Sequence, residues 1–112
     1  MNKIKVITQK IPLKNISNSK YLDFSYELTT MASNYDGFIT SKFYNNPFDL
    51  DLIHKTTEPP FYNISDWKNI DYWNKWIESK ERENIIKKFN FNFECNHTIL
   101  QERKIEANIF LG

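Results

Sequence analysis

The sequence has few residues of the kinds that cross-link a chain, bind metal or span a membrane. Its 112 residues include one cysteine, Cys95, and two distant histidines. A lone cysteine cannot form an internal disulfide, and this set has no zinc-ligand spacing, so no metal is expected. Apolar runs are only a few residues long, and the N-terminus alternates instead of forming a signal-peptide core. A cytoplasmic protein without a membrane partner is predicted.

An excess of charge of one sign is missing as well. Lys and Arg number 15 and Asp and Glu number 14, mixed along the chain, for a formal net charge of +1. No basic stripe indicates nucleic acid or an anionic membrane, so nucleic acid is not an expected partner. At this length, residues 1–112 are predicted to form a single domain, which is small for a monomer that must also enclose a pocket.

Aromatic residues are abundant, and all three tryptophans of the chain, Trp67, Trp73 and Trp76, lie within ten residues. The residues leading to Trp67 fit a half-buried strand, and from Ile70 onward the apolar period lengthens towards 3.6 residues. The tract is therefore predicted to pass from a strand into an amphipathic helix.

Capping residues suggest that this helical region is divided. Asn69 or Asp71 can cap its first turn, because each offers a side-chain oxygen to an unpaired amide. Ser79 can cap a second segment, whose apolar stripe ends at Phe89. A kinked helix pair is predicted.

Alternation and turn residues place the other elements. Strands are expected at 3–11, 38–44, 61–67 and 97–105, a first helix at about 20–34, a long loop at 45–60 and a connector at 89–96. A β-α-β-β-α-β order with antiparallel pairing predicts an α+β fold of the ferredoxin-like, split βαβ class, a four-stranded sheet with both helices on one face.

The second face of that sheet also carries apolar residues. On the third strand, Tyr62 and Ile64 lie opposite Phe61, an arrangement that a face in contact with water does not require. We therefore expect the sheet of a second copy to cover this face. A homodimer is predicted, with the segment after Ile105 reaching the partner.

The segment from Ile64 to Arg82 resembles the signature of the antibiotic biosynthesis monooxygenase (ABM) family of dimeric α+β barrels. That signature is a strand ending in Trp, a short polar helix start, then an aromatic-rich helix with Trp and Ser and a following Arg. Gly37 and Phe38 are similar to the family's Pro-Gly-Phe entry to the second strand, although Asp36 replaces the proline. The family includes oxygenases, haem degraders and members of unknown role, so the resemblance implies the fold more directly than the activity.

The haem-degrading branch of the family is matched only in part. It uses an Asn on the first strand, a Trp in the second helical region and a His ten residues after that Trp. Trp76 matches the Trp, but the His position is Ile86 and the Asn position is Thr8 or Gln9. Without an axial nitrogen at that site, haem is not expected, and no other cofactor is predicted.

The cofactor-free oxygenase branch acts on electron-rich polycyclic phenols and has an Asn and a Trp four residues apart on the third strand, with a Tyr shortly afterwards. Asn63, Trp67 and Tyr72 resemble that arrangement. The resemblance implies a cofactor-independent monooxygenase for an aromatic, phenolic small molecule, in which the Asn amide and the indole N–H stabilise an oxyanion. The residues expected to bind the substrate are Tyr62, Trp76 and His97.

Each of these residues also has a purely structural interpretation. The tryptophans can be core and interface filler, and Asn63 can be a strand-end hydrogen-bonding residue. His97 can be a general base if it faces the pocket, or a solvated residue at the strand end. The alternative function is therefore a non-catalytic dimeric module of the same fold that binds a hydrophobic small ligand or none.

Overall fold

A computed structural model describes residues 2–13, 16–45, 61–90 and 92–103 of the chain. The elements in these residues are β1 (Ile4–Pro12), α1 (Asn18–Ala32), β2 (Phe38–Asn45), β3 (Phe61–Trp67), α2 (Ile70–Ile77), α3 (Lys80–Phe89) and β4 (Phe93–Gln101). The predicted loop at 45–60 and the segment after Ile105 lie outside the described residues, except for Asn45 at the end of β2.

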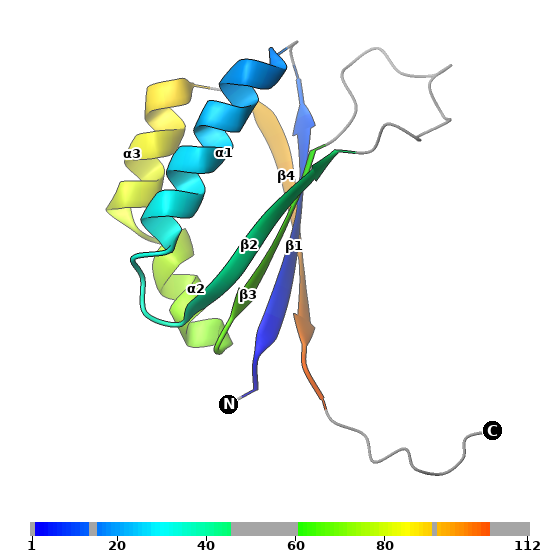
Figure 1. Ribbon diagram of the computed structural model, residues 1–112, viewed down its shortest axis with the longest axis vertical. Coiled ribbons are helices and arrows are strands. Elements are labelled where there is room, and N and C mark those ends of the chain that lie inside the picture. Colours follow the sequence, from blue (N-terminus) through cyan, green and yellow to red (C-terminus); the bar gives the residue numbers. More distant parts are fainter. Residues whose placement is uncertain (1, 14–15, 46–60, 91, 104–112) are drawn as a thin grey trace, which may run out of the picture.

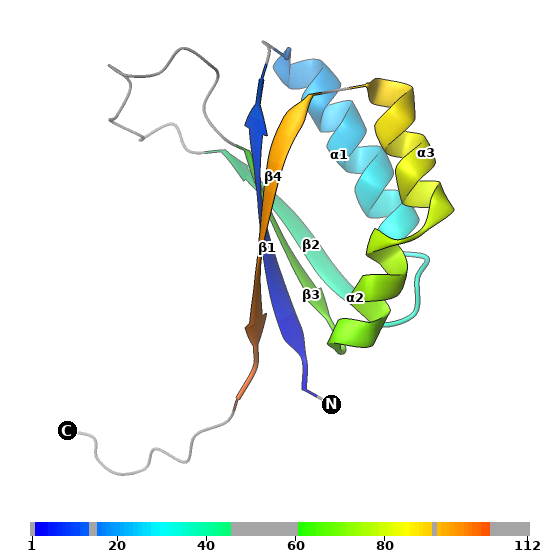
Figure 2. The same ribbon diagram turned by 180° about the vertical axis from the view of Figure 1, so that it is seen from behind.

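The strands form one antiparallel sheet in the order β2-β3-β1-β4. The three helices cover one face of this sheet, and none of the described helices lies on the other, bare face (Figures 1 and 2). Central strand β1 pairs with β3 on one side and with β4 on the other, so the two halves of the chain interlock at the middle of the sheet. The predicted α+β, ferredoxin-like fold is confirmed.

Each helix begins at a residue whose side chain caps it. Ser17, Asn69 and Ser79 accept hydrogen bonds from first-turn amides of α1, α2 and α3. The Ser79 amide and hydroxyl both donate to the Trp76 carbonyl oxygen, which closes α2 just before α3 starts. The predicted division of the second helical region at Ser79 is thus confirmed.

The core lies between the helices and the sheet. Strand β1 alternates strictly, and Ile4 and Val6 point towards the helices with exposures of 4% and 0%. Helix α1 contributes Phe24 and Leu28 to the same core. These two buried residues lie one helical turn apart, on the face of α1 that is turned to the sheet. At the end of β3 the large side chain of Trp67 is almost fully enclosed. Apolar burial of this kind is the main term that stabilises a small domain.

The last strand begins four residues earlier than the sequence indicated. Strand β4 runs from Phe93 to Gln101, and these end residues lie opposite Pro12 and Ile4 of β1. Pairing with the full length of β1 therefore sets the bounds of β4. This pairing is a tertiary interaction, so the local sequence of β4 does not predict it. The alternating Phe and Asn residues interpreted as a connector at 89–96 belong partly to this edge strand.

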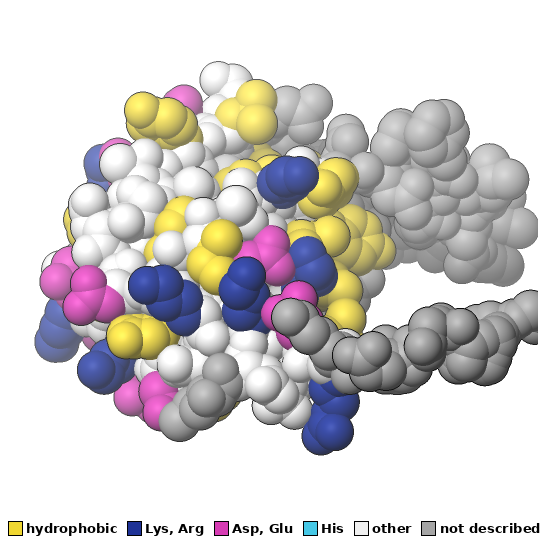
Figure 3. Space-filling model, turned by 60° about the horizontal axis from the view of Figure 1, so that its bottom comes forward, with side chains coloured by type: hydrophobic (Ala, Val, Ile, Leu, Met, Phe, Trp, Pro, Cys, Tyr) yellow, Lys and Arg dark blue, Asp and Glu magenta, His cyan; other side chains and the backbone are white. Residues whose placement is uncertain are grey.

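Charged side chains of both signs are interspersed over the end of the molecule seen in Figure 3. This mixture agrees with the near-zero net charge of the whole sequence. Within the described ranges, no helix is long and apolar enough to cross a membrane.

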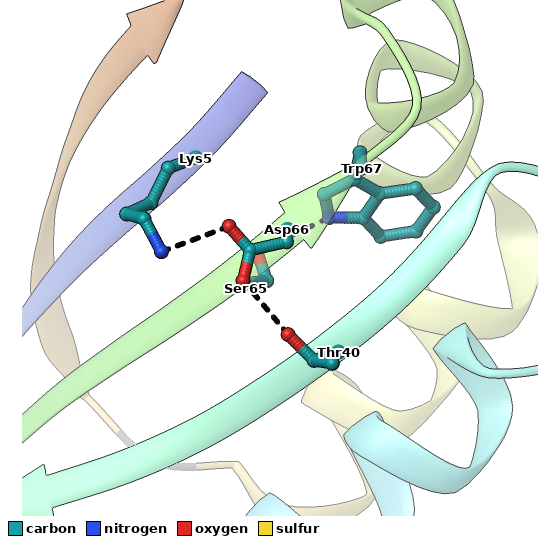
Figure 4. A network of polar contacts seen from close by, with 5 residues as sticks. All are labelled: Lys5, Thr40, Ser65, Asp66 and Trp67. Carbon is teal, nitrogen blue, oxygen red and sulfur yellow. Dashed lines mark hydrogen bonds and ion pairs between the residues drawn. The ribbon is translucent and has the colours of Figure 1, made fainter. Parts of the chain in front are cut away.

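The bare face of the sheet mixes apolar and polar side chains. Ile7 of β1 lies directly opposite Ile64 of β3 and both are half-buried, without a helix above them. On the same face the Asp66 carboxylate forms an ion pair with Lys5 at 2.9 Å and accepts a hydrogen bond from Thr40 at 2.8 Å (Figure 4). Asp66 thereby links three neighbouring strands across a face that water can reach.

Gly37, between α1 and β2, makes a close contact that leads to a first testable prediction. Its φ of +85° lies in the left-handed region, and an added Cβ would overlap the Tyr72 ring. Gly37→Ala should lower the free energy of unfolding by about 2 kcal/mol, because the backbone becomes strained and the ring must move. Urea denaturation measures this change. The exposed helical variant Thr30→Ala is the control, and equal unfolding midpoints for both variants would contradict the expectation.

Candidate functional site

A cavity of about 50 Å³ lies between the helices and the sheet. It has room for about four water molecules at roughly 10–15 Å³ each. Pockets that enclose drug-sized ligands measure about 300–1,000 Å³, so this cavity is narrow. All three tryptophans, Trp67, Trp73 and Trp76, line it.

Three polar side chains form a row across the sheet at this cavity. His97 of β4 lies opposite Thr8 of β1, and Thr8 lies opposite Asn63 of β3. All three line the cavity, because residues directly opposite each other in a sheet point to the same face. The register of the two β1 ladders thus brings together groups that are far apart in sequence.

Asn63 is held in a definite orientation. The Ser41 hydroxyl of β2 donates to Asn63 Oδ1 at 3.2 Å. This leaves the amide N–H groups of Asn63 as the donors, and no described residue accepts a hydrogen bond from them. A ligand oxygen in the cavity can therefore accept from this amide.

Trp67 differs from the expectation drawn from the sequence. Its indole N–H donates to Ser65 Oγ at 3.1 Å, and the residue is 1% exposed (Figure 4). The donor that was expected to act together with the Asn63 amide is therefore engaged within the protein. Trp67 contributes the wall of the cavity, and its indole N–H is not aimed at a ligand.

The structure places two of the predicted site residues away from this cavity. Tyr62 precedes Asn63 on β3 and so points to the bare face, where its hydroxyl accepts a hydrogen bond from Gln9 Nε2 at 3.3 Å. Tyr72 lies in the first turn of α2, against Gly37. Neither tyrosine lines the cavity, whereas Trp76 and His97 both do.

His97 is positioned by two neighbours. Its Nδ1 lies 2.8 Å from the Thr8 hydroxyl, and its ring meets Trp73 edge-on, with centroids 5.4 Å apart. His97 lies on the exposed edge strand β4, and the partial burial of its ring against the cavity lowers its pKa; the positive charges of Arg82 and Lys10 lower it further. The imidazole is therefore neutral at about pH 7, and a neutral imidazole can accept a proton.

Two cationic residues of the cavity were missed by the sequence analysis. Lys10 of β1 is 6% exposed, and its Nζ lies 5.0 Å from the centroid of the Phe24 ring. Burial lowers the pKa of Lys10 to about 8. Arg82 of α3 also lines the cavity, and burial lowers its pKa as well. The burial of Lys10 could have been predicted from the alternation of β1, because Lys10 lies on the same strand face as Val6 and Thr8.

The residues at the positions used by the haem-degrading branch of the ABM family, Thr8 and Ile86, supply no ring nitrogen. The Thr8 hydroxyl contacts His97, and Ile86 lines a neighbouring apolar hollow. Among the residues that the structure describes, no three of His, Cys, Asp and Glu gather into a potential metal site. The expectation that haem does not bind remains a prediction.

No family model and no curated protein matches the sequence. Solved structures do match the fold. SnoaB, a cofactor-independent oxygenase from Streptomyces nogalater, is 7% identical with a TM-score of 0.70, and the match covers 96% of this chain and 100% of SnoaB. A candidate antibiotic biosynthesis monooxygenase from Nitrosomonas europaea is 8% identical with a TM-score of 0.68, covering 91% of this chain and 92% of that protein.

A dimeric ferredoxin-like protein of unknown function from Thermobifida fusca matches as well. It is 10% identical with a TM-score of 0.65, and the match covers 90% of this chain and 92% of that protein. Similarity at these identities establishes the fold alone. The fold implied by the resemblance to the ABM family is thus confirmed, and the solved proteins that share it include an oxygenase and a dimeric protein.

Proposed function

We propose that this chain is a cofactor-independent monooxygenase of the ABM type, acting on a small phenol bound between the helices and the sheet. The row of His97, Thr8 and Asn63 carries the proposal, because it places a proton acceptor and an oxyanion donor on one cavity. The shared fold with a cofactor-independent oxygenase supports the same assignment.

The proposed reaction needs one proton transfer and one stabilised anion from the protein. Neutral His97 takes the phenolic proton, and the Asn63 amide donates to the resulting oxyanion. The electron-rich ring then reacts with oxygen at a carbon that bears hydrogen. One oxygen atom stays on that carbon as a new carbonyl and the other leaves as water, so the phenol becomes a quinone and supplies all four electrons itself.

The size of the cavity limits the substrate. A volume of about 50 Å³ is a third of the roughly 150 Å³ of a cavity that holds benzene, so the cavity walls must move apart to admit one ring and much further to admit a polycyclic system. The three tryptophans supply flat apolar walls, which suit an aromatic ring. We therefore propose a single-ring phenol as the substrate class.

Two observations favour the alternative of a non-catalytic dimeric module that binds a small ligand. The cavity is narrow, and the indole N–H of Trp67 is engaged by Ser65, so the site has fewer free donors than the resemblance implied. Such a module would bind a small ring in the same place and leave it unchanged.

Oxygen uptake separates the two functions. Wild-type protein treated with a chelator is mixed with a panel of single-ring phenols and with anthrone-like phenols in an oxygen electrode. The proposal expects uptake with single-ring phenols, at one oxygen molecule for each quinone formed. Ligand binding without uptake across the whole panel would favour the binding module.

We further propose that the protein is a homodimer whose two sheets pack face to face. The half-buried pair Ile7 and Ile64 and the ring of Tyr62 lie on the sheet face that the described helices leave uncovered (Figure 1). A dimeric protein of the same fold supports this assembly. When two sheets pack face to face, they lie about 10 Å apart, and the side chains of both inner faces are buried between them.

Disruption of this face tests the assembly. Ile64→Lys should convert the protein from a dimer to a monomer at a concentration of about ten micromolar, because it buries an unpaired charge in the interface. Sedimentation velocity measures the change. Leu22→Lys, at an exposed position on α1, is the matched control and should remain dimeric. A wild-type monomer, or a dimeric Ile64→Lys, would contradict the proposed interface.

A further inference from the structure

The cavity holds two cationic side chains without a counter-ion. Lys10 and Arg82 both line it, and its lining includes no Asp or Glu. Within the described part of the chain, neither the Lys10 ammonium nor the Arg82 guanidinium forms a hydrogen bond or an ion pair. Lys10 is 6% exposed, so water replaces these missing partners poorly.

The surroundings of Lys10 do not neutralise it. Its Nζ lies near the rings of Phe24 and Phe43, at 5.0 Å and 6.0 Å from their centroids, and near Tyr21 of α1 at 5.9 Å. The other titratable groups that act on it are Arg82 of α3 and Cys95 of β4. Burial of like charges without an acid destabilises a fold, and such arrangements are concentrated at functional sites.

Lys10 and Arg82 also border a second hollow. This hollow measures about 110 Å³ and is otherwise lined mainly by apolar side chains, including Phe24 and Phe93. Lys10 and Arg82 therefore lie at the boundary between the cavity lined by the tryptophans and this second, mainly apolar hollow. A ligand can place an anionic group at these cations while its ring contacts aromatic walls on either side.

We infer that the ligand of this cavity is a single-ring aromatic carboxylate, whose carboxylate pairs with Lys10 and Arg82 while its ring packs against the tryptophans. Arg and Lys are the usual partners of a carboxylate, and Arg can bind both of its oxygens. For the proposed monooxygenase, this makes the substrate a phenol that also carries a carboxylate, such as a hydroxybenzoate. The inference rests on the proposed function only in assigning the ligand to the same cavity.

Tryptophan fluorescence provides a direct test, because every tryptophan of the chain lines the cavity. Benzoate and benzamide serve as probes, since they have the same ring and differ in charge. We expect benzoate to bind at least about tenfold more tightly than benzamide, because a hydrogen bond to a charged group contributes about 1.5–3 kcal/mol and 1.4 kcal/mol corresponds to a factor of ten. Inorganic sulfate should compete only weakly, because it has no ring for the aromatic walls.

Two variants assign the preference to Lys10. Lys10→Met keeps the length of the side chain and removes the charge, and should reduce the preference for benzoate to less than about threefold. Lys20→Met, in the solvated first turn of α1, should keep the preference of the wild type. If Lys10→Met does not fold, the wild type still reports the effect, because the preference should decline as the pH rises through about 8 and Lys10 loses its proton.

The outcomes separate this inference from the proposed function. Equal binding of benzoate and benzamide, or an unchanged preference in folded Lys10→Met, would overturn the carboxylate assignment even if phenols are oxidised. A tenfold preference with no oxygen uptake from any hydroxybenzoate would support the carboxylate site and overturn the oxygenase. Sulfate that competes as well as benzoate would overturn the role of the aromatic walls.

Discussion

Replacement of Asn63 by alanine is expected to slow oxygenation of a phenolic substrate about a hundredfold or more. Loss of one oxyanion donor typically removes about 2.7–4 kcal/mol of transition-state stabilisation. The Asn63 amide is well placed for this role, because Ser41 fixes its oxygen and leaves its N–H groups towards the cavity. Steady-state oxygen uptake by the two proteins measures the change in kcat/KM.

Two controls distinguish a catalytic Asn63 from a structural one. Ser41→Ala removes only the group that orients the amide, so a smaller loss of about tenfold is expected. Thermal melts of wild type and Asn63→Ala should agree within a few degrees. A large loss of stability without a selective loss of rate would show that Asn63 serves the fold.

Replacement of Lys10 by methionine is expected to raise the free energy of unfolding by about 3 kcal/mol near pH 7. Burial lowers the pKa of Lys10 from 10.5 to about 8, and each unit corresponds to about 1.36 kcal/mol. The charged lysine therefore destabilises the folded state, and methionine fills the same space without a charge. Urea denaturation of both proteins measures the difference.

The pH dependence of this difference has a definite sign. Below about pH 8, Lys10 is protonated in both the folded and the unfolded state, so the full destabilisation is present. Between about pH 8 and 10.5 only the unfolded state keeps the proton, so wild-type stability rises with pH and approaches that of Lys10→Met. The control Lys20→Met, at an exposed position of α1, should change the stability little at pH 7. A Lys10→Met protein that is less stable than the wild type at pH 7 would contradict the buried, unpaired charge.

Such a gain in stability would connect the lysine to function. Residues that destabilise a fold and yet occupy its binding cavity are expected where activity and stability conflict. If Lys10→Met is both more stable and unable to prefer benzoate, the charge has a role that the fold itself does not require.

Local patterns were sufficient for most of the fold. The cap Ser79 and strand β3, Phe61–Trp67, followed from hydrogen-bonding chemistry and alternation. The position of β4 did not, because its start at Phe93 depends on pairing with β1. Edge strands with mixed residues carry a weak local signal, so their bounds are set by tertiary pairing.

The site was less accessible to sequence reasoning. Asn63 and Trp67 were expected from the family resemblance, and their even spacing on β3 puts both on the cavity face. The same alternation puts Tyr62 on the opposite face from Asn63, so the expectation that both residues line one pocket conflicted with the strand geometry. Lys10 escaped notice because lysine on a strand is usually solvated, and only the packing of α1 and α3 buries it.

The most direct test of the proposed function uses isotopically labelled oxygen gas. Chelator-treated wild-type protein is incubated with a hydroxybenzoate under this gas, and the product is analysed by mass spectrometry. The proposal predicts a quinone that contains one labelled oxygen atom, with the second labelled atom recovered in water. A product without label, or an unchanged hydroxybenzoate together with saturable binding, would contradict an oxygenase and identify the protein as a binding module.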